Sequence, residues 1–135
     1  MAIIEGFNIR NYRVLKNITI GKLWKQRKEK PLTPLVAVIG KNGVGKSTLF
    51  DSFGFLADCL AVGVEEACDR KQRGGFARLV SSGCKDPIGF EVYYRESSNE
   101  RPITYELSIA LDKDHRPYVA EERLRQWRKK PNYQR

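Results

Sequence analysis

A glycine-rich segment at residues 40–48, GKNGVGKST, constrains the fold of this chain more than any other feature. It follows residues 35–39, a continuous apolar run of the kind found in parallel strands that are buried on both faces. After it, apolar residues recur in steps of three and four, which predicts a helix from residue 46 to about residue 70. A strand, a glycine-rich turn and a helix in this order predict an α/β domain built around the turn.

The predicted helix has one apolar face and ends before two glycines. Gly74 and Gly75 lie just past its expected end, where glycines commonly terminate helices. The residues of the apolar face are Leu49, Phe53, Leu56, Leu60, Val64 and Ala67. Their spacing predicts that one continuous helix packs against a core.

The glycine-rich segment has the spacing G-x-x-x-x-G-K-(S/T), at Gly40, Gly45, Lys46 and Ser47. Glycines let backbone N–H groups curl around a polyphosphate, and the helix that follows adds its positive N-terminal end. Lys46 can then reach the β- and γ-phosphates, and the Ser47 hydroxyl can bind Mg²⁺. The expected ligands are therefore a nucleoside triphosphate and Mg²⁺. The predicted nucleotide site comprises Gly40, Lys41, Asn42, Gly43, Val44, Gly45, Lys46, Ser47 and Thr48, with Ser47 as the magnesium ligand.

Five further segments have the composition of strands. In the fourth, Tyr105, Leu107 and Ile109 alternate with polar or small residues, a period of two that is typical of a half-solvated antiparallel sheet. The polar segments on either side of it suit hairpin turns. The predicted strands cover residues 3–11, 17–24, 88–95, 103–111 and 118–127. Together with the buried run at 35–39, they predict a mixed core sheet and an antiparallel β-meander.

Length, composition and cysteine content limit the class of protein. The 135 residues suffice for one domain, and 41% hydrophobic with 30% charged residues are typical of a globular protein. The chain shows no secretory signal and no apolar run long enough for a membrane span. Cys59, Cys68 and Cys84 have neither the spacing of a disulfide framework nor that of a zinc site. We therefore expect a cytoplasmic protein without membrane contact.

The net charge of +9 is concentrated in two basic clusters. A basic surface attracts phosphate backbones, but solvated surface loops have the same composition, so both interpretations stay open. The first cluster, a candidate DNA contact, comprises Lys22, Lys25, Arg27, Lys28 and Lys30, and the second comprises Arg123, Arg125, Arg128, Lys129, Lys130 and Arg135.

Several stretches carry a resemblance to a known family. A strand ending in Asn11-Tyr12-Arg13, the loop GKNGVGKST with Asn42, and the downstream GGFARLVSSG and YVAEERLR resemble predicted AAA-family ATPases of the RecF/SMC/OLD-like group. A GTPase would carry an Asn-Lys-x-Asp guanine reader, which the chain lacks. The resemblance implies the N-terminal lobe of an ABC/RecF-like P-loop NTPase. It also implies ATP binding and hydrolysis coupled to DNA-related work, in repair or phage defence, by a homodimer or with a partner subunit.

The chain departs from that family in one respect. A Walker B strand should end in Asp-Glu, but Asp112 follows an alternating strand and precedes Lys113. We therefore interpret Asp112 as a hairpin-turn residue, His115 as a solvated residue of the same turn, and Gln72 as a surface residue. No catalytic residue is assigned, and we expect residues 1–135 to be the N-terminal Walker A part of a longer ATPase, inactive alone. A nucleotide-binding module without turnover and a nucleic-acid-binding domain remain alternatives.

Overall fold

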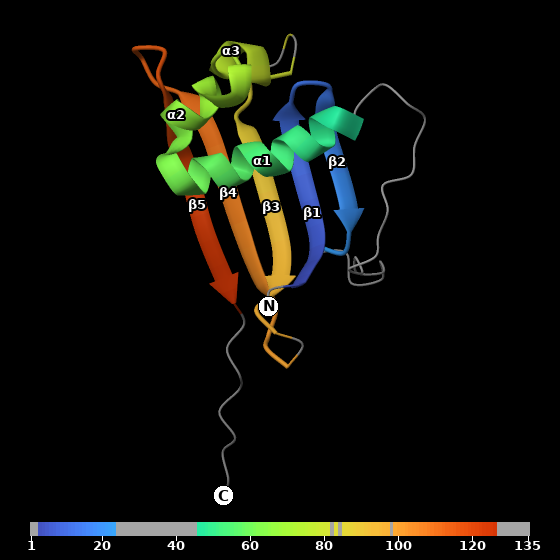
Figure 1. Ribbon diagram of the computed structural model, residues 1–135. Helices are drawn as coiled ribbons and strands as arrows, with labels where there is room; N and C mark the ends of the chain where they lie inside the picture. Colours follow the sequence, from blue (N-terminus) through green and yellow to red (C-terminus); the bar gives the residue numbers. More distant parts are fainter. Residues whose placement is uncertain (1–2, 24–45, 82, 84, 98, 127–135) are drawn as a thin grey trace, which may run out of the picture.

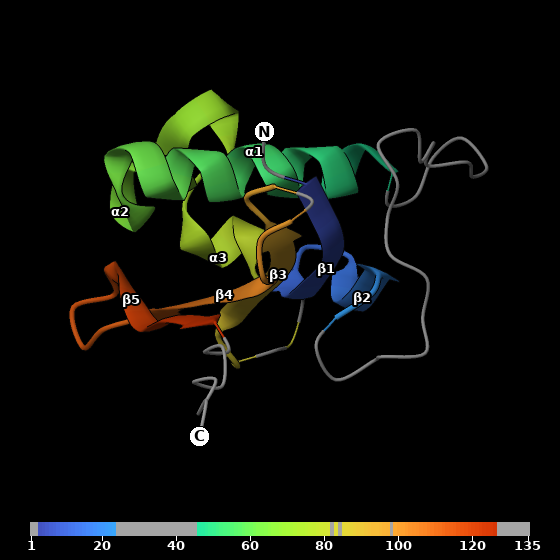
Figure 2. The same cartoon turned by 90° about the horizontal axis from the view of Figure 1, so that it is seen from below.

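The computed structural model describes residues 3–23, 46–81, 83, 85–97 and 99–126. They form a layered α/β arrangement in which a sheet carries its helices on one face (Figure 1 and Figure 2). The strands are β1 (Ile3–Tyr12), β2 (Leu15–Gly21), β3 (Ile88–Arg95), β4 (Ile103–Leu111) and β5 (Pro117–Gln126). The helices are α1 (Lys46–Val62), α2 (Val64–Asp69), the 3-10 helix η1 (Arg70–Gln72) and α3 (Phe76–Leu79).

The sheet has the order β2-β1-β3-β4-β5, and each described pair of neighbours is antiparallel. β1 pairs with β2 next to it in sequence and with β3 beyond all the helices. β3, β4 and β5 form the predicted meander, and β3 and β4 have the bounds that their composition and alternation predict. The register places Ile9, Phe90 and Leu107 in one row across three strands. This row faces the helices, since the Phe90 ring centroid lies 5.9 Å from that of Phe55 in α1, and all three side chains are buried.

The core lies between the sheet and α1. Phe7 on β1 faces Phe53 of the helix with a ring-centroid separation of 4.3 Å. Phe55 is 0% exposed, and its ring centroid lies 5.4 Å from that of Tyr12 and 5.9 Å from that of Phe90. Full burial of a large apolar side chain stabilises a fold by about 1.5–3 kcal/mol. These aromatic contacts therefore hold α1 on β1 and β3.

The predicted single helix from residue 46 to about residue 70 is wrong. α1 ends at Val62, and α2 begins after Gly63, whose φ of 92° and ψ of 161° are accessible almost only to glycine. The apolar face also differs, since Leu60, predicted to be buried, is 61% exposed, whereas Cys59 beside it is buried. The helical spacing continues across Gly63 in the sequence, but the backbone turns there and α2 packs in a new direction (Figure 1).

Two other predictions concern the strands. The apolar run at residues 35–39 lies outside the described residues, and the five described strands are antiparallel throughout, so the mixed sheet is not seen in this part of the chain. The second predicted strand, residues 17–24, is observed as β2 at Leu15–Gly21. Within the described residues, no helix has the length and apolar composition of a membrane span.

Candidate nucleotide site

The sequence predicts the nucleotide site at the N-terminal end of α1. Residues 40–45 lie outside the described residues, and Lys46 and Ser47 are the first two residues of the helix. Thr48 follows them and is half-buried. The first turn of α1 contains no acidic residue. Its unpaired backbone N–H groups and positive end therefore attract an anion without a carboxylate of the same turn to oppose them.

Asp51, in the second turn of α1, connects the helix to β1 and to the segment after η1. The Tyr12 hydroxyl donates to Asp51 Oδ2, and Arg73 Nε donates to Asp51 Oδ1 over 3.4 Å. Arg13 Nη2 lies 3.9 Å from Asp51 Oδ2. Burial, together with the hydrogen bond to Asp51, raises the pKa of Tyr12 well above its usual range. Tyr12 therefore remains a protonated donor at neutral pH.

Arg73 carries a buried positive charge next to α1. Its side chain is 1% exposed, and Nη1 donates to Asp58 Oδ2 over 2.7 Å and to the Ala67 carbonyl over 3.0 Å. The guanidinium carbon lies 5.3 Å from the centroid of the Phe55 ring. Burial lowers the pKa of Arg73, but the hydrogen bond to Asp58 and the charge of Asp51 together outweigh it, so the net shift is upward. The charge is therefore kept despite its burial, because carboxylates compensate it.

Asp51 and Asp58 lie seven residues apart in α1, so both project from the same side of the helix. Arg73 bridges them, and Asp58 also lies 3.9 Å from Arg70 and 3.8 Å from Lys71. The hydrogen bond from Arg73, aided by the neighbouring positive charges, holds the pKa of Asp58 below its usual value. We call the four residues Tyr12, Asp51, Asp58 and Arg73 the α1 clamp. Both carboxylates of α1 are engaged in this clamp, which fixes the helix that begins at Lys46.

The sequence pattern does not identify the α1 clamp. The spacing of Asp51 and Asp58 indicates a shared side of the helix, which is a signal that could have been used. Nothing in the sequence near Arg73 predicts that it is buried. The three residues before it, Arg70, Lys71 and Gln72, are polar, and all three are exposed in the structure.

The structure agrees with the interpretation of three polar residues as turn or surface positions. Asp112 Oδ1 accepts hydrogen bonds from the backbone N–H groups of Asp114, at 2.8 Å, and Arg116, at 2.9 Å, in the β4–β5 turn. His115 lies in the same turn and is exposed, and Gln72 is exposed in η1. In the part of the chain that the structure describes, no three His, Cys, Asp or Glu side chains gather as a metal site.

The two basic clusters lie only partly within the described residues. Lys22 follows β2, and Arg123 and Arg125 lie on β5. Arg123 is 2.6 Å from Glu121, and Arg125 is paired with Glu106, so both of these positive charges already have carboxylate partners. The cluster members outside the described residues are Lys25, Arg27, Lys28, Lys30, Arg128, Lys129, Lys130 and Arg135.

Comparison with known families decides the class of this domain. Residues 35–132 match the family described as "AAA domain, putative AbiEii toxin, Type IV TA system". The chain belongs to this AAA family. The match begins at the apolar run before the glycine-rich segment and includes α1 to β5, so the AAA domain contains both the motif and the helix that follows it. Comparison with curated proteins and with solved structures gave no match.

Membership makes the chain a P-loop, ATPase-type nucleotide-binding domain. AAA domains of this type generally bind ATP with Mg²⁺. The N-terminal end of α1 fits such a ligand, because its first turn has no acidic residue that would repel the phosphates.

Proposed function

We propose that this AAA domain binds Mg–ATP at the N-terminal end of α1 and serves as the Walker A part of a RecF/SMC/OLD-like ATPase. One observation supports this above the others. The sequence GKNGVGKST runs into α1, which begins at its Lys46 and whose first turn contains no acidic residue, in a chain of the AAA family. A polyphosphate at this end meets unpaired N–H groups and the positive end of the helix dipole.

Each residue of the motif has a role in this proposal. The backbone N–H groups of residues 40–45 surround the phosphates, and Lys46 contributes a positive charge to the β- and γ-phosphates. The Ser47 hydroxyl is a ligand of Mg²⁺, and Thr48 contacts the α-phosphate. When bound, Mg²⁺ neutralises charge on the β- and γ-phosphates.

The α1 clamp supports the proposal by holding the helix in position. Asp51 lies five residues after Lys46, and its carboxylate is held by β1 through Tyr12 and by Arg73. A binding site works best when the element that carries it is fixed before the ligand arrives. Because the clamp already fixes α1, less conformational entropy is lost when Mg–ATP binds.

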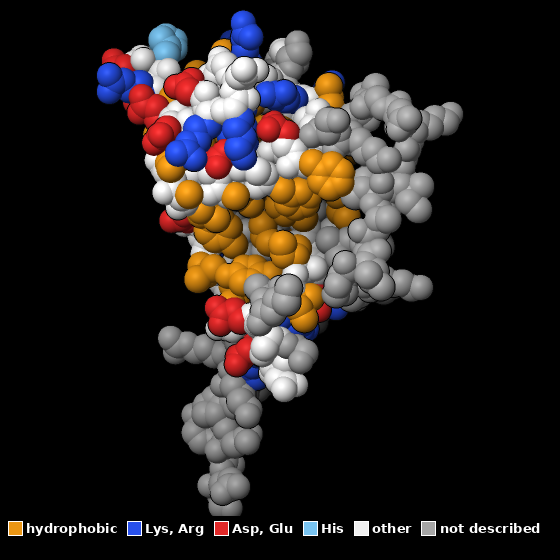
Figure 3. Space-filling model, viewed as in Figure 1, with side chains coloured by type: hydrophobic (Ala, Val, Ile, Leu, Met, Phe, Trp, Pro, Cys, Tyr) orange, Lys and Arg blue, Asp and Glu red, His pale blue; other side chains and the backbone are white. Residues whose placement is uncertain are grey.

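We extend the proposal to a second protomer or a partner subunit, with ATP use coupled to DNA-related work in repair or phage defence. Apolar side chains gather on the α1 side of the molecule, over both the helix and the sheet (Figure 3). Phe50 and Leu60 on α1 are 60% and 61% exposed, and Leu124 on β5 is 64% exposed. Exposed apolar groups that cluster on one side are typical of surfaces that pack against another domain.

A nucleotide-binding module without turnover is the second candidate. It is favoured by the pairing of both α1 carboxylates with Arg73, which leaves neither of them free to orient a water molecule. Hydrolysis would then require carboxylates from outside α1.

Isothermal titration calorimetry of Lys46→Ala with Mg–ATP tests the proposed function. Loss of a charged contact to phosphate should weaken binding at least about tenfold, since such contacts contribute roughly 1.5–3 kcal/mol. Lys113→Ala, in the exposed β4–β5 turn, is the matched control and should bind as the parent does. Thermal unfolding should be unchanged in both variants. Equal affinity of Lys46→Ala and the parent would exclude the nucleotide site.

A further inference from the structure

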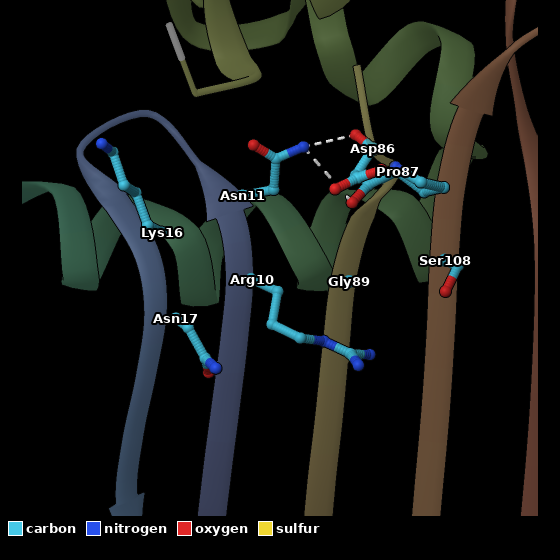
Figure 4. Close-up of a pocket in the computed structure, with 8 residues that line it drawn as sticks. All are labelled: Arg10, Asn11, Lys16, Asn17, Asp86, Pro87, Gly89 and Ser108. Atoms are coloured by element: carbon cyan, nitrogen blue, oxygen red, sulfur yellow. Dashed lines mark hydrogen bonds between the residues drawn. The ribbon is translucent and has the colours of Figure 1, made fainter. Parts of the chain in front are cut away.

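A pocket opens on the face of the sheet that is turned away from α1. It has a volume of about 340 Å³ and lies over β2, β1, β3 and β4, near the ends where β1 stops and β3 begins. In Figure 4 the helix lies behind the sheet, and the Arg10 side chain extends from β1 across β3 toward β4. The lining residues used below are Arg10, Lys16, Asn17, Asp86, Gly89 and Ser108.

Gly89 makes room for Arg10 on this face. The two residues are paired across β1 and β3. A Cβ atom at position 89 would lie 2.8 Å from Arg10 Nη2 and 2.9 Å from Nε. The guanidinium therefore occupies the space that a side chain at position 89 would fill, and any larger residue would push it out of the pocket.

Arg10 and Lys16 form no ion pair with another described residue, although charges elsewhere on this face are paired. Arg123 and Arg125 on β5 have Glu121 and Glu106 as partners. Two unpaired positive charges that line one pocket attract an anion more strongly than the same charges would when compensated.

Hydrogen-bond donors accompany these charges. Asn17 Oδ1 accepts from Asn8 Nδ2 over 2.9 Å, which leaves the Asn17 amide nitrogen as a donor. The Ser108 hydroxyl lies on the β4 side of the pocket (Figure 4). Asp86 is the acidic residue among those that line the pocket, and it lies before β3, at the far end from the Arg10 guanidinium (Figure 4). The Arg10 side of the pocket thus combines a positive charge with donors from Asn17 and Ser108, whereas the Lys16 side chain points away from Arg10, toward the β1–β2 turn (Figure 4).

We propose that this pocket binds a phosphate group, held by the Arg10 guanidinium with Asn17 and Ser108 as additional donors, while Lys16 at the opposite end of the pocket adds positive charge at longer range (Figure 4). The phosphate belongs either to a nucleic-acid backbone or to a free phosphate ion or nucleotide, since both present the same oxygen atoms. None of the described residues that line the pocket is aromatic, so no base is stacked there and binding is independent of sequence. The pocket lies on the opposite face of the sheet from α1 and is separate from the proposed Mg–ATP site (Figure 4).

The first test is a titration of the whole chain with inorganic phosphate, followed by amide chemical shifts. A Lys46→Ala background removes the contribution of the glycine-rich motif. Shifts should appear at pocket residues, and Arg10→Gln/Lys16→Gln should weaken phosphate binding at least about tenfold. The control Lys113→Gln/Arg116→Gln also removes two positive charges, but from the exposed β4–β5 turn, and should leave phosphate binding unchanged.

Short duplex DNA distinguishes the two sources of phosphate. If the backbone is the ligand, Arg10→Gln/Lys16→Gln should also reduce the slope of log K against log salt by about two, and the control pair should not. A loss of inorganic phosphate binding without an effect on DNA would identify free phosphate as the ligand. Equal effects of both double variants, or no effect of either, would overturn the proposal, because binding would then reflect net charge or another surface.

Gly89→Ala provides a test that leaves all charges in place. Its Cβ atom should displace the Arg10 guanidinium and weaken phosphate binding several-fold, with the thermal unfolding midpoint near that of the parent. The clash is with the flexible end of a side chain, so the fold should tolerate the change. Unchanged phosphate binding in Gly89→Ala would overturn the proposal, since binding would not depend on the position of Arg10 over β3.

Discussion

Arg73 donates to Asp58 from a position where its own side chain is 1% exposed, and the Nη1–Oδ2 distance is 2.7 Å. The same guanidinium reaches Asp51 through Nε. One buried cation therefore contacts two carboxylates of the helix that follows the glycine-rich motif. The energetic importance of this arrangement can be measured.

Arg73→Met should destabilise the fold by about 3 kcal/mol, because it removes the buried hydrogen-bonding partner of Asp58 and Asp51, and the cations that remain near these carboxylates lie 3.8–3.9 Å away. The change is measured by urea unfolding at neutral pH. Arg78→Met, an exposed position on α3, should change the free energy of unfolding by less than about 0.5 kcal/mol. Similar values for the two variants would show that the α1 clamp does not stabilise the fold.

Acid should weaken the clamp through Asp58. Because the folded-state pKa of Asp58 is lowered, its contribution is fully present above the ordinary carboxyl pKa of 3.8 and is lost as pH falls through the lower folded value. Asp58→Asn should therefore be less stable than the parent at pH 7, and the difference should shrink as pH falls below 3.8. Urea midpoints at several pH values measure this. A constant difference between the two proteins would contradict the assignment.

Two glycine-to-alanine changes near α1 should have opposite signs. Gly63→Ala should destabilise the fold by about 1–3 kcal/mol, because φ 92° and ψ 161° strain any residue with a Cβ atom. Gly54→Ala should stabilise it by about 0.5–1 kcal/mol, since Gly54 is inside α1 and its Cβ atom would meet Arg73 Nη2 at an ordinary 3.6 Å. Urea unfolding compares both with the parent. A stabilising Gly63→Ala would show that the break between α1 and α2 is not fixed by glycine.

The purified chain should hydrolyse ATP no faster than its Lys46→Ala variant. A carboxylate that orients the attacking water and an acid that holds Mg²⁺ are both required, and the absence of each should raise the barrier by several kcal/mol. Phosphate release under steady-state conditions measures the rate. Sustained turnover that Lys46→Ala abolishes would reveal a catalytic acid, with Asp112 and Glu121 as the first candidates to substitute.

The strands were more predictable than the helices for a physical reason. Period-two alternation reports which face of a strand is buried, and Leu107 and Ile109 are buried as that alternation predicts. The helical spacing, by contrast, runs unbroken through Gly63 and so conceals the turn between α1 and α2. The backbone conformation at Gly63 changes the direction of the chain but not the spacing of the apolar residues in the sequence, so the spacing could not reveal the turn.

One part of the candidate site could be predicted from the sequence and another part could not. The motif around Lys46 is identified by spacing, because phosphate binding needs glycines and a lysine at fixed positions. The α1 clamp depends on contacts between Tyr12, Asp51 and Arg73, which are far apart in sequence. No local sequence pattern predicts such contacts. The proposed phosphate pocket on the opposite face of the sheet is equally hidden in the sequence, because it depends on the cross-strand pair Arg10 and Gly89.

The order β2-β1-β3 determines when the sheet can close during synthesis. Phe7 and Ile9 on β1 are made before the helices, but their neighbours Val92 and Phe90 on β3 are made only after all of them. At about 5–20 residues per second, the edge of β1 that pairs with β3 stays unpaired for on the order of ten seconds. During that interval the nascent chain presents an unpaired strand edge, to which a strand of another chain can pair.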